Sequence, residues 1–96
     1  MVDLIIGRSA SKEVEEKIRL TALGVPHVEK IMELKTLHIG SEKLLVNMEV
    51  HLKHGLTTGE IERLIDFIKV NIQRQVPEVK HIQVELESLS KHPIKT

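Results

Sequence analysis

The stretch from Leu44 to Leu52 restricts the fold of this chain more than any other segment does. Apolar and polar side chains alternate along it, with Val46, Met48, Val50 and Leu52 apolar and Asn47, Glu49 and His51 polar. Because successive side chains of a strand point to opposite faces, this period of two predicts a half-buried β-strand. Its polar side carries a carboxylate and an imidazole two residues apart, so the strand is both a core element and a possible ligand platform.

A helix and a first strand are predicted before it. Ser9 or Ser11 can cap a helix over about residues 10 to 23, and Gly24 can end it with a left-handed cap. Residues 28 to 39 then predict a strand, with Met32 and Leu34 on its apolar side as core residues. The apolar residues change parity further along this strand, which indicates either a bulge near its far end or cover on both of its faces. The four residues 40–43 have the length of a hairpin connection, so the two strands should be antiparallel.

A second helix and a third strand follow. Thr57 and Glu60 have the spacing of a capping box, and Pro77 ends the amphipathic segment that follows it. Residues 79–86 alternate again, with His81, Gln83 and Glu85 on the polar side. This polar side should lie beside Asn47, Glu49 and His51 if the second and third strands are neighbours.

The order of these elements predicts the fold class. A strand, a helix and another strand form a right-handed crossover whose two strands are parallel. We therefore expect an α+β protein, an α-β-β-α-β ferredoxin-like or metallochaperone-like sandwich in which two helices cover one face of a three-stranded mixed sheet. The bare face is a natural surface for a second copy of the chain. Residues 1–8 are interpreted as a linker, residues 9–87 as the domain and residues 88–96 as a flexible tail.

Composition excludes several functions. The 14 basic and 14 acidic residues cancel, and the chain has one Phe with no Tyr or Trp, which argues against a nucleic-acid partner. Cysteine is absent, so there is no thiolate metal site and no thiol nucleophile. No apolar stretch is long enough to span a bilayer, and we expect a soluble polypeptide. No catalytic motif is present, so we expect no enzymatic activity.

The polar side chains that share one face of the predicted strands at residues 44–52 and 79–86 have two interpretations. They form either a solvated face or a site at which two histidines, His51 and His81, and nearby carboxylates bind a divalent ion. Imidazole together with carboxylate suits zinc, iron or manganese about equally.

Several segments, in their order, resemble the C-terminal cytoplasmic domain of cation diffusion facilitator (CDF) transporters. They are Leu4-Ile5-Ile6-Gly7-Arg8-Ser9, Gly24-Val25-Pro26-His27-Val28, Leu34-Lys35-Thr36-Leu37-His38-Ile39-Gly40, Leu45-Val46-Asn47-Met48-Glu49-Val50 and Val79-Lys80-His81-Ile82-Gln83-Val84-Glu85. The resemblance implies a homodimeric domain on the cytoplasmic side of the cell membrane, attached by residues 1–8 to the membrane domain of an exporter of divalent cations. It also implies that metal bound between the two copies draws them together and biases transport.

The resemblance also suggests metal ligands. Zinc-binding members tend to carry histidines, and one final carboxylate, at the positions that here are Met32, Glu49, Glu62, Gln83 and Glu85. Only the carboxylate at Glu85 is kept, and oxygen ligands at Glu49 and Glu62 would shift preference from zinc toward manganese or iron(II). The candidate metal ligands are therefore Glu49, Glu62 and Glu85, with His51 and His81 from the strand pattern. Two alternatives stay open: a constitutive dimerisation module that needs no metal, and a free-standing ferredoxin-like ligand-binding domain.

Overall fold

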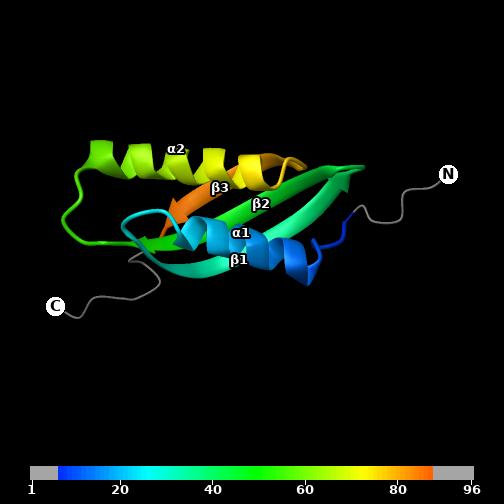
Figure 1. The fold of residues 1–96 in the computed structure, drawn as a ribbon, viewed down its shortest axis with the longest axis horizontal. Helices are drawn as coiled ribbons and strands as arrows, with labels where there is room; N and C mark the ends of the chain where they lie inside the picture. The colour runs from blue at the N-terminus through cyan, green and yellow to red at the C-terminus, as the bar shows by residue number, and fades with distance from the viewer. Residues whose placement is uncertain (1–6, 88–96) are drawn as a thin grey trace.

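The structure, a computed structural model, describes residues 7–87 as two helices packed on one face of a three-stranded sheet (Figure 1). The elements are α1 (Lys12–Leu23), β1 (Val28–Gly40), β2 (Lys43–Leu52), α2 (Thr58–Gln75) and β3 (Val79–Leu86). β2 is central, antiparallel to β1 and parallel to β3. The predicted α-β-β-α-β architecture is confirmed. Residues 1–6 of the predicted linker and the whole predicted tail lie outside the described residues.

α1 begins as predicted but ends differently. The Ser11 side chain accepts a hydrogen bond from the Val14 backbone N–H at 3.2 Å, so Ser11 rather than Ser9 is the N-cap. The predicted left-handed cap at Gly24 is wrong, because Gly24 keeps right-handed angles (φ −76°, ψ −8°). The chain turns once more, through a bond from the Val25 N–H to the Ala22 carbonyl, and reaches positive φ only at His27 (73°).

β1 contains more bulges than the sequence pattern indicated. Its register against β2 shifts near Gly40, as predicted, and also between Val28 and Lys30 and between Ile31 and Glu33. At the last of these shifts two residues of β1 stand opposite one of β2, which turns Met32 out of the core and leaves it 41% exposed. The expectation that Met32 fills the core is wrong for this reason.

The other junctions follow local chemistry. The hairpin is tighter than predicted, because Gly40 and Lys43 pair with each other and only two residues form the loop. Glu42 in that loop has a φ of 54°, the left-handed value that such short turns need. Both hydrogen bonds of the predicted capping box at Thr57 and Glu60 are present.

The core lies between the helices and the apolar side of β2. Four β2 side chains are buried there, together with residues of both helices: Leu44, Val46, Met48 and Val50 from β2, Ile18 and Ala22 from α1, and Ile68 and Ile72 from α2. Both helices therefore cover the same face of the sheet, and Figure 1 shows them on one side of it. Within residues 7–87, no helix lies over the opposite face.

The N-terminal residues of the described chain are attached to the end of β1. Gly7 donates its backbone N–H to the His38 carbonyl at 2.8 Å, and His38 donates to the Arg8 carbonyl at 2.7 Å. Next to this pairing, the buried Thr36 hydroxyl accepts from the Ala10 N–H at 2.8 Å and donates to a Glu15 carboxylate oxygen at 2.6 Å. One hydroxyl thus joins the segment before α1, α1 itself and β1.

Candidate functional site

The sheet face without helices, here called the open face, carries a row of three carboxylates. Glu49 is the register partner of Glu33 on β1 and of Glu85 on β3, so the three side chains lie across the sheet at strand spacing, about 4.8 Å per step. We call these three residues the acidic row. Their alignment follows from the register shift between His38 and Gly40, after which residues 33–38 of β1 keep one continuous register that puts Glu33 opposite Glu49.

Next to it lies a row with no negative charge. Asn47 is paired with Lys35 on β1 and Gln83 on β3, and we call these three residues the amide row. The two rows together line one shallow hollow in the open face. Within the chain, Gln83 donates its side-chain amide to Glu85 at 2.9 Å, and the Lys35 ammonium lies 3.5 Å from a Glu33 oxygen.

Glu49 is the most enclosed of the three carboxylates, with 8% of its surface exposed. It sits on the central strand, so both neighbouring strands shield it from the side, whereas Glu33 and Glu85 are exposed. A carboxylate that loses water in this way gains more from a nearby cation than a fully hydrated one does. Glu49 is therefore the least hydrated carboxylate of the acidic row.

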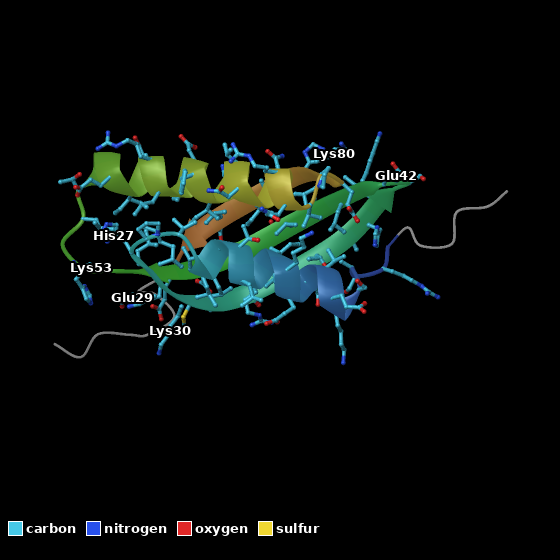
Figure 2. The ribbon with its side chains drawn as sticks, viewed as in Figure 1. His27, Glu29, Lys30, Glu42, Lys53 and Lys80 are labelled. Carbon is cyan, nitrogen blue, oxygen red and sulfur yellow. The ribbon has the colours of Figure 1, made fainter. Side chains whose placement is uncertain are left out.

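A second polar group lies at one end of the open face, around His51. Its Nδ1 is 2.6 Å from a Glu87 oxygen, and its Nε2 is 3.5 Å from a Glu29 oxygen. Figure 2 shows Glu29 at this end of the molecule, close to Lys30 and far from Glu42 in the hairpin. Both ring nitrogens thus already face carboxylates of the same chain, and a metal ion at His51 would have to share or displace them.

The structure brings together some of the predicted ligands and separates others. Glu49 and Glu85 are neighbours, and His51 follows Glu49 two residues along β2. His81 is instead the register partner of Leu45, which places it roughly 20 Å from His51 along the strands. Glu62 is exposed on α2, in the helical layer on the other side of the sheet. Within residues 7–87 no three His, Asp or Glu side chains are grouped closely enough to hold a metal ion.

Three carboxylates of the open face were not among the predicted site residues. Glu33 was missed because the register that brings it opposite Glu49 depends on the shift between His38 and Gly40 and not on the alternation of β1 alone. Glu29 and Glu87 were missed because their role depends on the position of His51 relative to two other strands. The recurrence of Glu at both Glu85 and Glu87, two residues apart on one parity, was the one local signal available.

Among the helices that the structure describes, neither is long and apolar enough to cross a membrane.

Comparison with known proteins identifies the domain. Residues 10–89 match the family model described as cation efflux protein, cytoplasmic domain. The nickel form of a MamM C-terminal domain variant has a TM-score of 0.75 at 17% identity, over 81% of this chain and 98% of that one. A cadmium form of a second MamM variant has a TM-score of 0.74 at 16% identity, over 80% and 95% of the two chains. No curated protein matches the chain. The structural likeness supports the fold. The family model matches most of the sequence and agrees with the resemblance found in the residues. This chain therefore belongs to the family of cation efflux protein cytoplasmic domains, the cytoplasmic domains of CDF proteins.

Proposed function

We propose that this domain dimerises through its open face and binds a divalent cation between the two copies, and that the bound cation biases an attached transporter. Glu49 and Glu85 are the central ligands in this proposal. The transporter's membrane domain would precede residue 8, with the present domain on the cytoplasmic side of the cell membrane. The observation that carries the proposal is the acidic row, an enclosed glutamate between two others on the face that no helix covers.

A metal site between two copies is supported by the small number of ligands that a single copy offers. Because no three suitable side chains are grouped within residues 7–87, one copy supplies an incomplete coordination shell. A second copy of the open face would supply further oxygen ligands to the same ion. The family to which the chain belongs is that of a cation efflux protein, and its structural neighbours include nickel and cadmium forms.

The donor set favours hard cations. The acidic row offers only carboxylate oxygens, and the amide row beside it adds amide oxygens at Asn47 and Gln83. Oxygen ligands suit manganese and iron(II) better than they suit zinc, which prefers nitrogen and sulfur. The proposed order of preference is therefore manganese or iron(II) before zinc.

The other predicted ligands receive different parts in the proposal. His51 lies two residues from Glu49 and serves as an outer ligand or as an anchor for Glu87. His81 and Glu62 are too far from Glu49 in the same copy to share its ion, so they would bind metal only through a partner copy. Replacing His51, His81 and Glu62 with Ala, one at a time, separates their effects on metal binding from the effect of Glu49.

Small-angle scattering and calorimetric titration of the chelator-treated chain test the proposal. We expect manganese, iron(II) or zinc to bind and to make the dimer more compact, and we expect Glu49→Ala with Glu85→Ala to abolish both effects. Glu16→Ala, which removes an exposed carboxylate of α1, is the matched control and should change neither. A dimer that ignores all three ions would instead support the constitutive dimerisation module. A monomer at every concentration would refute the dimerisation itself.

A further inference from the structure

We propose that the Lys35 ammonium is a counter-ion built into the acidic row, and that it raises the concentration of divalent cation at which the row binds metal. This inference rests on the proposed function, because it assigns a regulator to the same metal site. It follows from the position of one positive charge among the three carboxylates of the hollow in the open face.

Lys35 reaches the acidic row from β1. It lies two residues after Glu33, so the two side chains project from the same face of that strand. Its ammonium is 3.5 Å from a Glu33 carboxylate oxygen. Its register partner is Asn47, which makes Glu49 its diagonal neighbour, at a spacing of roughly 7–8 Å that long side chains can span. One lysine is therefore within reach of two carboxylates of the row.

The charges that line the hollow are unequal in number. Besides the three carboxylates of the acidic row, the described residues that line it bring uncharged side chains and the single ammonium of Lys35. A divalent ion that enters the hollow is attracted by the carboxylates and repelled by this ammonium. The metal must therefore either displace the lysine side chain or bind in spite of its repulsion.

The ion pair between Lys35 and Glu33 is too exposed to contribute much to folding. The side chain of Lys35 is 72% exposed and that of Glu33 is 48% exposed, and water and salt screen pairs of this kind. The same exposure leaves the lysine side chain room to turn toward solvent when a metal ion arrives. The pair therefore acts on the occupancy of the hollow more than on the stability of the domain.

The size of the repulsion follows from the strand spacing. At about 7 Å in bulk water, a unit charge opposes a divalent ion by an amount that lowers affinity roughly 5- to 10-fold. Screening at physiological ionic strength reduces this factor to roughly 2- to 3-fold. The low exposure of Glu49, 8%, limits the water that can screen the charges next to it.

Calorimetric titration of the chelator-treated chain with manganese, and with zinc in a second series, tests the inference. Lys35→Met removes the charge and keeps an unbranched side chain, so it should tighten metal binding about 5- to 10-fold at low ionic strength. Added salt should reduce this gain to about 2- to 3-fold, because it screens the charge that the variant removes. Lys35→Arg keeps the charge and should bind metal no more tightly than wild type does.

Lys43→Met is the matched control. Lys43 is an exposed lysine on β2, the strand that carries Glu49, but it lies six residues away, or roughly 20 Å along the strand. At that distance its charge should change metal affinity by less than about 2-fold.

The possible results separate this inference from the proposed function. Equal metal affinities of wild type and Lys35→Met would overturn the counter-ion and leave the metal site in place. A gain that stays the same as salt is added would also overturn it, because the gain would then not come from the charge. A failure of both wild type and Lys35→Met to bind either metal would overturn the metal site itself.

Discussion

Replacing Thr36 with Val tests the junction at which β1 holds the start of the domain. The two side chains have almost the same shape, so the change removes one hydroxyl from a site that is 6% exposed. That hydroxyl accepts from the buried Ala10 N–H and donates to Glu15. The substitution leaves the Ala10 donor and the Glu15 carboxylate without this partner.

The expected loss of stability is the sum of two costs minus one gain. A hydrogen bond to a charged group contributes about 1.5–3 kcal/mol, and a buried donor left unsatisfied costs about 1–3 kcal/mol. The new methyl group at position 36 returns about 0.8 kcal/mol through apolar burial. Since Glu15 regains water at the partly open side, we expect a net loss of about 2–3 kcal/mol, or roughly 10–20 °C in Tm for a domain of this size.

Urea unfolding followed by far-ultraviolet circular dichroism measures this loss. The chain has no Trp or Tyr, so intrinsic fluorescence offers no convenient signal. Protein concentration must be held constant, because dimerisation makes apparent stability depend on it. Hydrogen exchange supplies a local readout, in which the Ala10 amide should lose protection before the rest of the core.

Two companion variants decide whether the reasoning holds. Thr36→Ser keeps the hydroxyl and should cost about 1 kcal/mol or less through the lost methyl group. Glu15→Ala removes one acceptor, and its effect should be strongly non-additive with Thr36→Val because the two groups share one hydrogen bond. A Thr36→Val protein within about 0.5 kcal/mol of wild type, or purely additive behaviour, would show that the hydroxyl does not hold this junction.

Two further predictions concern the α2 cap and the pair Met32 and Met48. The backbone hydrogen bond from Thr57 holds the pKa of Glu60 below its usual 4.5, so the stabilisation by this carboxylate is complete above that value and is lost as pH falls through the lowered pKa. Glu60→Gln should therefore destabilise the protein at pH 7 and have a smaller effect at pH 3, as measured by urea unfolding at both pH values. Met48→Ala should lower the free energy of unfolding by about 2–4 kcal/mol because Met48 is 3% exposed. Met32→Ala should lower it by less than about 1 kcal/mol because Met32 is 41% exposed. Equal losses for the two variants in thermal unfolding would contradict the bulge beside Met32.

The order and kind of the elements could be predicted because each depends on residues close together in the sequence. The capping box at Thr57 and Glu60 and the strict alternation of β2 and β3 are local patterns with local physical causes. The parallel arrangement of β2 and β3 also followed from the β-α-β connection, whereas the register that pairs Glu49 with Glu85 did not.

The candidate site was predictable only in part, because distances between strands are not local. Glu49 and Glu85 were recognised, but alternation alone did not place Glu33 beside them, and it grouped His51 with His81 although they lie at opposite ends of the open face. Glu62 was nominated by resemblance, and the structure places it in the helical layer.

By itself, the sequence determined five elements, one apolar side for each of β2 and β3, and the absence of Cys, Tyr and Trp. Only the tertiary structure decided which β1 residues share a face with the others. The register shift between Ile31 and Glu33 turns Met32 outward, and the shift between His38 and Gly40 aligns Glu33 with Glu49. A bulge exists only relative to a partner strand, so the residues of one strand cannot specify it, and the charge order of the open face depends on it.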